Sequence, residues 1–332
     1  MMLQLGLIFL ILNSLIFLNL DKLSKIININ DKPDEKLKKH KFTTPLLGGT
    51  IFLINFLILI LVNLVYAEKI IFLSFSKREL ISIFLFILFF YFIGLYDDKY
   101  KLKPEKKFIL IILICIVSLS INKNILINNI STTLYDYTIF LNNFEFVFTI
   151  FCIIILINAL NFYDGINGQS LIFFIIIYSF LAYKSFLTGF YIYIVFTLLF
   201  LLFLNLKNKI FLGDNGIYLI GAILILSIIY EHNIFKSFVF VEEIFIMLMF
   251  PGFDLVRLTI LRIIRGKNAF YGDRNHVHHL LIGKYSLLKS NIILSMYILI
   301  PISLFSFLKL NFYLVLFIFT ISYIILINHT SK

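Results

Sequence analysis

Charged residues are scarce in this chain, and their scarcity indicates what class of protein it is. Asp, Glu, Lys and Arg make up 14% of the 332 residues, whereas 61% of the residues are hydrophobic. A soluble domain of average composition is about one quarter charged. The composition therefore excludes a sizeable soluble domain. It predicts an all-α, polytopic membrane protein in which residues 1–332 form a single integral membrane domain.

Tryptophan is absent and cysteine nearly so. Aromatic belts at membrane interfaces commonly use both Trp and Tyr, so Tyr has to fill that role alone here. The two cysteines, Cys115 and Cys152, both lie inside apolar runs. They are too few for a four-ligand zinc site built from Cys. Packing in the apolar core is favoured over a disulfide between them.

Long apolar runs are the main organising feature of the chain. A membrane-spanning helix needs about 20 mostly apolar residues, and about 11 segments approach that length. The first lacks a basic n-region and a small-residue cleavage site, so it is predicted to be a span and not a signal peptide. The predicted spans are Leu3–Leu20, Leu46–Tyr66, Leu80–Tyr96, Phe108–Ile121, Tyr137–Leu160, Leu171–Tyr183, Phe190–Leu206, Ile217–Tyr230, Val241–Ile264, Asn291–Phe307 and Asn311–Ile327.

The distribution of positive charge predicts the orientation of the chain. Seven lysines follow the first span between positions 22 and 41. Cytoplasmic loops are enriched in Lys and Arg, which places the N-terminus outside and, after about 11 spans, the C-terminus in the cytoplasm. The net charge of +11 then fits cytoplasmic loops that face anionic lipid or an anionic substrate.

Polar residues concentrate in four clusters, and this topology places all four on the cytoplasmic side. The clusters are Gly94–Lys99, Asn158–Gly168, Phe211–Gly216 and Gly272–His279. Polar groups at the edge of the hydrocarbon region are costly and are commonly functional. Ordinary alternatives exist: the second cluster could cap two helices, and Asp97-Asp98 could be a solvated helix end. Their shared side predicts one composite site.

The residue types in these clusters indicate phosphoryl transfer. Adjacent carboxylates such as Asp97 and Asp98 repel each other, which raises one pKa and suits a general base or a metal contact. Asp214, on a short turn, suits Mg²⁺, which takes carboxylates together with substrate phosphates. The dense His276–His279 cluster lacks H-E-x-x-H spacing, so phosphate contacts are favoured over a zinc site. Metal-assisted phosphoryl transfer uses these parts.

In this order, the motifs resemble the polyprenyl-phosphate N-acetylhexosamine-1-phosphate transferase family, a part of glycosyltransferase family 4. The resemblance begins with Asp31-Lys-Pro33, His40 and Pro45–Gly49, and it extends to about Gly283. It implies that the phosphate of a polyprenyl phosphate, such as undecaprenyl phosphate, attacks the sugar-bound phosphorus of a UDP-N-acetylhexosamine. UMP then leaves and a lipid diphosphate sugar remains. It also implies a multi-pass plasma (inner) membrane enzyme with a cytoplasmic active site, and it admits a homodimer.

The resemblance also implies roles for individual residues. Asp214 and Asn161 would hold Mg²⁺, or Mn²⁺ in its place. Asp97 would be the base toward the lipid phosphate, with Asp98 and Asp164 supporting the site, and the Phe211 ring would stack on uracil. The remaining substrate contacts would come from Asn158, Asn167, Arg274, His276, His278 and His279.

The choice of sugar is open at this stage. Asn167 stands where many bacterial members have Asp, and Gln169 where many have Leu or a small apolar residue. The Asp273–His279 motif is closer to the branch that starts O-antigen and teichoic-acid chains. This favours UDP-N-acetylglucosamine, or a modified UDP-N-acetylhexosamine, over the UDP-muramoyl pentapeptide used in lipid I synthesis. Two other classes remain as alternatives, an ion-coupled secondary transporter and a membrane scaffold. Transporters place their sites near the bilayer midplane in repeated halves, and no repeat is visible here.

Overall fold

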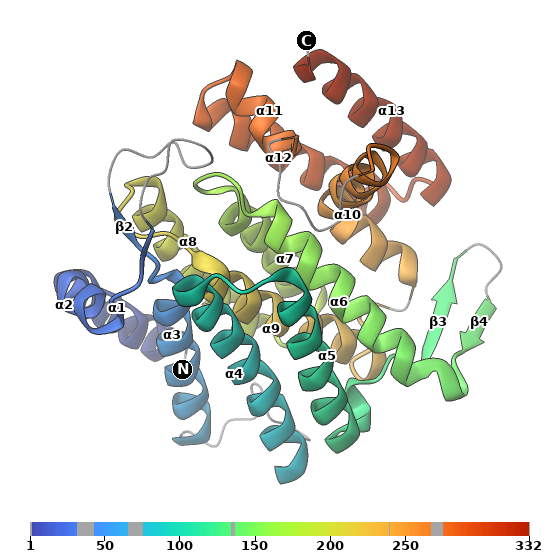
Figure 1. Cartoon of the computed structure of the whole chain (residues 1–332). Helices are drawn as coiled ribbons and strands as arrows, with labels where there is room; N and C mark the ends of the chain where they lie inside the picture. Colours follow the sequence, from blue (N-terminus) through green and yellow to red (C-terminus); the bar gives the residue numbers. More distant parts are fainter. Residues whose placement is uncertain are drawn as a thin grey trace.

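The apolar runs of the sequence fold as helices, and the computed structural model of the chain is an all-α, multi-pass membrane protein (Figure 1). The structure describes residues 2–31, 43–65, 76–133, 137–238, 240–266 and 275–331. Two small strand pairs are the β-structure of this part of the chain. The predicted fold class is confirmed.

Within its described residues, the first half of the chain contains helices α1 to α6 with short strands between some of them. The elements are α1 (Met2–Leu18), α2 (Leu20–Ile27), β1 (Asn30–Asp31), β2 (Thr44–Pro45), α3 (Gly48–Val65), α4 (Lys77–Tyr100), α5 (Pro104–Ile121), a 3₁₀ turn (Lys123–Ile125), β3 (Asn129–Thr132), β4 (Tyr137–Phe140), a second 3₁₀ turn (Asn142–Phe144) and α6 (Glu145–Tyr163).

The named elements of the second half are all helical within its described residues. They are α7 (Gln169–Lys184), α8 (Thr188–Leu206), α9 (Gly213–Asn233), α10 (Val241–Ile264), α11 (Val277–Lys284), α12 (Leu287–Ile302), a π-helical turn (Ser303–Phe307) and α13 (Phe312–Ser331). Helices α11, α12 and α13 lie together on one side of the molecule, at the top of Figure 1.

Each of the 11 predicted spans coincides with a helix or with most of one. Within the described residues, seven helices are long and apolar enough to cross a membrane alone, and α1 with α2 forms an eighth candidate bent by 70°. Helices α3, α5 and α7 are among the predicted spans that fall outside this group. The total of 11 spans and the orientation of the termini stay predictions.

The fifth predicted span begins too early. Residues Tyr137–Phe140 form strand β4, which pairs antiparallel with β3, and helix α6 begins only at Glu145. Tyr137, Thr138 and Ile139 favour a pleated strand because β-branched and aromatic side chains pack well there. An apolar run alone does not separate such a strand from the helix that follows it.

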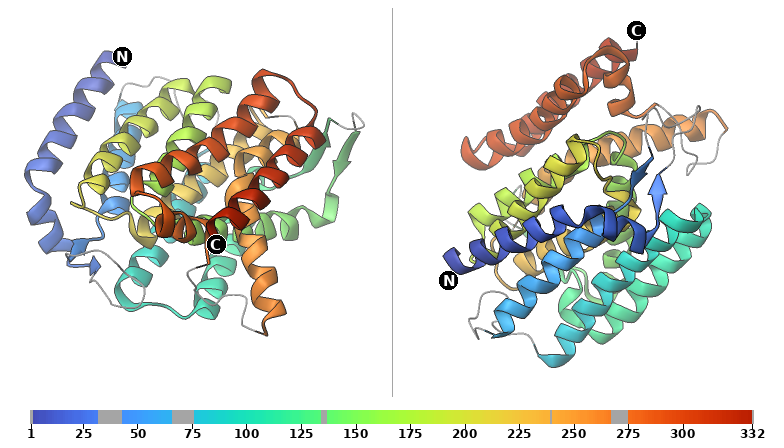
Figure 2. Two further views of the ribbon diagram at one scale, coloured as in Figure 1. Left: turned by 90° about the horizontal axis from the view of Figure 1, so that it is seen from above. Right: turned by 90° about the vertical axis from the view of Figure 1, so that its left-hand side faces the viewer.

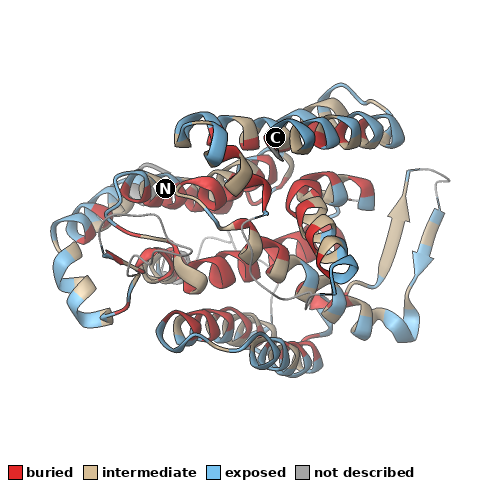
Figure 3. Cartoon of the chain, turned by 45° about the horizontal axis from the view of Figure 1, so that its top comes forward, coloured by how far each residue is buried: buried red, intermediate tan, exposed pale blue. Residues whose placement is uncertain are grey.

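Helix α9 is the centre of the molecule. Helices α3, α4, α6 and α7 pack around it, and its side chains are buried from Asn215 to His232. Figure 2 shows the helices from two further sides, and Figure 3 shows the buried residues gathered on the inner helices and the outer faces of the peripheral helices exposed. A Cβ atom added at Gly94 on α4 would lie 2.5 Å from Asn215 Cα. The close contact of α4 with the start of α9 therefore requires glycine at position 94.

Candidate active site

The motif Pro45–Gly49 and the motif Phe211–Gly216 meet at the start of α9. Phe211 N–H donates to the Pro45 carbonyl at 2.9 Å, and Gly48 N–H donates to the Phe211 carbonyl at 3.0 Å. The Asn215 amide adds a bond to the Leu46 carbonyl at 3.3 Å. These contacts fix the Phe211 backbone, so the ring that is predicted to stack on uracil projects from a fixed position. Asp31 on β1 pairs with Thr44, whereas the other first-loop residues, from Lys32 to His40, lie outside the described residues.

Asp98 caps the N-terminus of α9 from a neighbouring helix. Its Oδ1 accepts a hydrogen bond from Asp214 N–H and its Oδ2 one from Asn215 N–H, both at 3.0 Å. The first N–H groups of a helix have no partner within it, and the helix dipole favours a negative group there. Gly213 has φ +74°, and a Cβ on it would lie 2.7 Å from Asp98 Oδ2. The glycine therefore makes room for this cap.

Asp97 and Asp214 converge on one ammonium group. Lys107 Nζ forms an ion pair with Asp97 Oδ2 and lies 3.2 Å from Asp214 Oδ2. The other oxygen of Asp97 accepts from Leu102 N–H at 2.7 Å, in the turn after α4. That turn brings the first residues of α5 back over the end of α4. The two adjacent acids thus have different roles, since Asp98 binds backbone whereas Asp97 faces Asp214 across a cation.

The carboxylates around Lys107 fit a hard divalent cation. Mg²⁺ is commonly held by one or two carboxylates while it keeps waters and binds substrate phosphates. Asp97 and Asp214 already direct an oxygen each toward a common positive charge. Among the described residues, no three His, Cys, Asp or Glu side chains gather as a complete protein metal cage. The oxygen donor set suits a shared metal–substrate site, with Asp97 and Asp214 as its holders. Asn161, the other predicted ligand, lies in the last turn of α6.

The Asn158–Gly168 stretch is half helix and half turn. Asn158 and Asn161 belong to the end of α6, where the Asn158 amide donates to the Ile154 carbonyl at 2.8 Å. Asp164 follows the helix. Its burial raises the pKa of the carboxyl to about 7, and the charge of Asp214 acts in the same direction. The effect of the Asp214 charge indicates that the Asn158–Gly168 cluster lies near the Phe211–Gly216 cluster.

Asn167 and Gly168 fasten this turn to the segment before Phe211. The Asn167 amide donates to Asn208 Oδ1 at 2.6 Å, and Gly168 N–H donates to Asn205 Oδ1 at 2.7 Å. From the other side, the Asn291 amide donates to the Asn167 carbonyl at 2.9 Å. An acid at position 167 would lose the donated bond. The amide found here is therefore used as a structural donor, and its predicted contact with substrate stays a prediction.

The histidine cluster packs directly on the same turn. A Cβ added at Gly165 would lie 1.7 Å from His278 Nε2, so only glycine leaves room for this imidazole. His278 is 2% exposed and its Nδ1 faces Gln169 Nε2 at 3.4 Å. Burial lowers the pKa of His278 well below its ordinary value, and the charges of His279 and His276 add to this.

The three histidines are not equivalent. The rings of His276 and His278 stack at 5.2 Å with an angle of 11°, and both are buried. The ring of His279 meets His278 edge-on at 4.3 Å and is half-buried. His279 is thus the best placed of the three to touch a ligand. Arg274, predicted beside them, lies outside the described residues.

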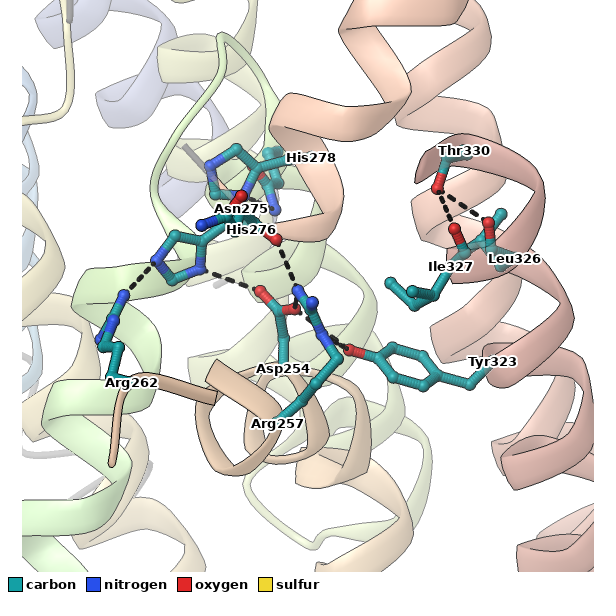
Figure 4. Close-up of polar contacts among 11 residues, drawn as sticks. Asp254, Arg257, Arg262, Asn275, His276, His278, Tyr323, Leu326, Ile327 and Thr330 are labelled. Carbon is teal, nitrogen blue, oxygen red and sulfur yellow. Dashed lines mark hydrogen bonds and ion pairs between the residues drawn. The ribbon is translucent and has the colours of Figure 1, made fainter. Parts of the chain in front are cut away.

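Several polar residues of the site were missed in the sequence. Lys107 was counted only as a basic loop residue, and Asp254, Arg257 and Arg262 of α10 lie inside a predicted span. Figure 4 shows Asp254 meeting His276, Arg257 and Tyr323. A signal was present: an acid and two arginines at spacings of three and eight residues occupy one predicted span, where ionisable residues are rare and commonly functional.

A large apolar cavity lies between α6, α9 and α10. Its volume is about 650 Å³, and its lining is made by Ile, Leu, Phe and Met side chains. Arg257 and Tyr323, which contact Asp254, also line it. The apolar cavity therefore extends to the polar cluster of Asp254, Arg257 and Tyr323, in which Asp254 contacts His276.

Known proteins are similar to this chain over the segment that carries these carboxylates. The sequence profile of "Glycosyl transferase family 4" matches residues 80–232, which include Asp97, Asp98, Lys107, Asp164 and Asp214. A probable undecaprenyl-phosphate N-acetylglucosaminyl 1-phosphate transferase of Bacillus subtilis is 27% identical over 75% of this chain and 68% of its own length.

Relatives of a second activity are equally similar. A phospho-N-acetylmuramoyl-pentapeptide-transferase of Prochlorococcus marinus is 29% identical over 76% of this chain and 74% of its own length. An undecaprenyl-phosphate alpha-N-acetylglucosaminyl 1-phosphate transferase of Haemophilus influenzae is 26% identical over 78% and 73%. The matches span the helices that carry the carboxylates, and over this segment the chain is similar to glycosyl transferase family 4 and to relatives of both activities.

Proposed function

We propose that this protein transfers an N-acetylhexosamine 1-phosphate from a UDP-sugar to undecaprenyl phosphate and releases UMP. The observation that carries the proposal is the meeting of Asp97, Asp98, Lys107 and Asp214 at the start of α9. One relative is named as a probable undecaprenyl-phosphate N-acetylglucosaminyl 1-phosphate transferase, and another as a phospho-N-acetylmuramoyl-pentapeptide-transferase. The site has the acids and the cation that phosphoryl transfer needs.

The proposed reaction forms one phosphorus–oxygen bond and breaks another. An oxygen of the lipid phosphate attacks the sugar-bound phosphorus, and the bond from that phosphorus to the bridging oxygen breaks, so UMP leaves with the bridging oxygen. Asp97 accepts any proton that remains on the attacking phosphate. Lys107 offers a positive charge beside the diphosphate. Asp97 and Asp214 would hold a bound Mg²⁺, or Mn²⁺, which would neutralise phosphate charge, and Asn161 is proposed as a further ligand. Asp98 keeps α9 and Asp214 in position.

The apolar cavity supports the lipid half of the proposal. A polyprenyl chain needs an apolar surface, and the space between α6, α9 and α10 provides one of about 650 Å³. Arg257 is one of its polar lining residues, and a guanidinium is suited to a phosphate. The proposed site lies on the cytoplasmic face of the plasma membrane, where UDP-sugars are found. Phe211, Asn158, Asn167 and His279 would contact the nucleotide sugar there.

We further propose UDP-N-acetylglucosamine as the sugar donor, so that the product starts a cell-surface glycan such as O-antigen. The Asp273–His279 motif supports this choice over lipid I synthesis. The relatives named above include both activities, so the donor is the part that needs measurement.

The test is an assay of UMP release in detergent with undecaprenyl phosphate and Mg²⁺, using UDP-N-acetylglucosamine, other UDP-N-acetylhexosamines and UDP-muramoyl pentapeptide. We expect release with UDP-N-acetylglucosamine and a loss of at least about 100-fold in Asp214→Asn, since one electrostatic contact in a transition state is worth this much. Release with only the muramoyl donor would overturn the donor assignment. No release with any of these donors would overturn the proposed reaction.

A further inference from the structure

Asp254 is a buried acid that none of the sequence motifs includes. It is 3% exposed, and its two oxygens have different partners. Oδ1 accepts from Arg257 Nη2 at 2.7 Å and from Tyr323 OH at 3.0 Å. Oδ2 contacts His276 Nδ1 at 2.9 Å. Three segments, α10, the start of α11 and α13, thus meet at one carboxylate (Figure 4).

The partners of His276 define where its proton is. A carboxylate only accepts hydrogen bonds, so Nδ1 must carry the proton that points to Asp254. The opposite nitrogen, Nε2, faces Arg262 Nη2 at 3.4 Å. A guanidinium only donates, so Nε2 must be the accepting nitrogen. The arrangement therefore selects the Nδ1–H tautomer of His276.

His276 transmits this constraint to the turn that carries Asp164. Its ring stacks on His278 on one side and on Phe162 of α6 at 5.7 Å. His278 in turn fills the space over Gly165, the residue after Asp164. A rotation of the His276 ring would thus disturb Phe162 directly and Gly165 through His278, and these two residues lie on either side of Asp164 in the chain.

We propose that Asp254 is a positioning residue of the active site: it fixes the tautomer and orientation of His276, and through the His276–His278 stack it holds the Asp164–Gly165 turn in place. The kinetic part of this inference rests on the proposed function, whereas the tautomer part does not. Second partners of functional histidines commonly set their tautomer in this way.

The variant Asp254→Asn tests the proposal because its geometry forces a defined outcome. Arg257 and Tyr323 both present donors to the Oδ1 position, so the new amide must place its oxygen there. Its NH₂ group then faces His276 Nδ1. That nitrogen must become an acceptor, and the proton must move to Nε2, where it opposes Arg262.

The tautomer is read by ¹⁵N NMR of protein with ¹⁵N-labelled histidine, at about pH 8, above the ordinary histidine pKa of about 6.5. Protonated and unprotonated ring nitrogens have well separated ¹⁵N shifts. The His276 signals are assigned from their loss in His276→Gln. We expect a protonated Nδ1 in the wild type and a protonated Nε2 in Asp254→Asn. A His276 that has the same tautomer in both proteins would overturn the proposal.

UMP release then shows whether the positioning matters for turnover. We expect Asp254→Asn to lower kcat/KM by about 10- to 100-fold, the range for partners that orient a functional histidine. The matched control is Asn13→Ala, which breaks the buried amide pair of Asn13 and Asn55 between α1 and α3. Both variants should lower the thermal midpoint, but the control should keep wild-type kcat/KM.

The outcomes separate the two proposals. If the wild type releases no UMP, the proposed function fails and the NMR result still decides the role of Asp254. If the tautomer of His276 changes in Asp254→Asn but kcat/KM stays at the wild-type value, a role of Asp254 in positioning for catalysis is refuted. If both variants lose activity in proportion to their stability, Asp254 is a structural residue only.

Discussion

Asp164 shows how the environment of one residue sets a measurable pH dependence. The pKa of its carboxyl is raised from an ordinary 3.8 to about 7 by burial and by the charge of Asp214. A group with a raised pKa in the folded state stabilises that state fully below the ordinary pKa, and this contribution is lost as pH rises through about 7. Asp164 thus opposes folding above about pH 7.

Replacing Asp164 by Asn should remove this pH dependence. We expect the stability of Asp164→Asn relative to the wild type to increase from pH 4 to about pH 7 and then to stay level up to pH 8, by at most about 4 kcal/mol at about 1.4 kcal/mol per pKa unit. The measurement is thermal or denaturant unfolding in detergent with EDTA, compared between the two proteins at each pH. A constant difference across this range would contradict the raised pKa. Turnover should fall in the same variant if the carboxylate orders the site.

Gly165 and His278 form a contact that a single methyl group should break. A Cβ at position 165 would lie 1.7 Å from His278 Nε2, so Gly165→Ala must displace a buried ring. Overpacking of this kind costs about 1–3 kcal/mol. We expect lower stability together with reduced UMP release. The matched control is Gly283→Ala on α11, where a Cβ meets nothing within 4 Å and the helix gains propensity.

The sequence identified the residue types of the site better than it identified their individual roles. Asp97 and Asp98 are adjacent and look alike in a motif, yet only Asp97 faces Asp214 through Lys107. Lys107 reaches Asp97 and Asp214 because the chain turns back between α4 and α5. The residue types alone did not indicate the backbone geometry of that turn. Asp254 and Arg257 stand three positions apart in a predicted span, a spacing that indicates a pair, whereas their contacts with Tyr323 join residues 69 and 66 positions apart and cannot be predicted from spacing.

At the scale of elements, the start of α9 depends on a cap that comes from α4. Asp98→Asn keeps the size of the side chain but replaces one accepting oxygen by a donor that faces a backbone N–H. We expect a loss of about 1–2 kcal/mol from the cap and the helix dipole. Faster amide exchange at Asp214 and Asn215 would locate the damage. Unchanged exchange at both amides would contradict the capping role.

Helix positions were well predicted because apolar runs of this length have few other ways to satisfy their backbone in a membrane. Val241–Ile264 has the predicted bounds. The error at Tyr137 arose where the chain leaves the helical pattern for a short hairpin. Glu242 fastens that hairpin: its Oε1 accepts from Thr133 N–H at 2.8 Å, a contact between residues 109 positions apart. The local sequence around the hairpin does not indicate which distant residue binds it.

At the scale of the whole molecule, the prediction that four clusters converge agrees with the contacts. Asp98 binds the start of α9, the charge of Asp214 acts on Asp164, and His278 packs on Gly165. The sequence indicated this convergence through the common side of the loops. It gave no sign of the apolar cavity, because the lining residues come from helices that are apolar on most faces.

The cavity offers a test that uses an open position in its wall. Gly252 of α10 lines the cavity, and a Cβ there meets nothing within 4 Å. A Cβ therefore fits at position 252, and Gly252→Leu should extend the rest of its side chain into the cavity and favour the helix. If a polyprenyl chain occupies the cavity, KM for undecaprenyl phosphate should rise by about tenfold, since losing apolar contact for two CH₂ groups costs about 1.6 kcal/mol. KM for the UDP-sugar should stay the same.

A matched change separates this effect from a general effect on the membrane helices. Gly6 lines a different apolar cavity, between α1 and α8, and also has no atom within 4 Å of an added Cβ. Gly6→Leu should leave both KM values unchanged. An acceptor with a prenyl chain shorter than the roughly 7.5 Å between Arg257 and Gly252 along α10 should lose the difference between Gly252→Leu and the wild type, because it does not reach position 252. Equal effects on long and short acceptors would place the lipid chain elsewhere on the molecule.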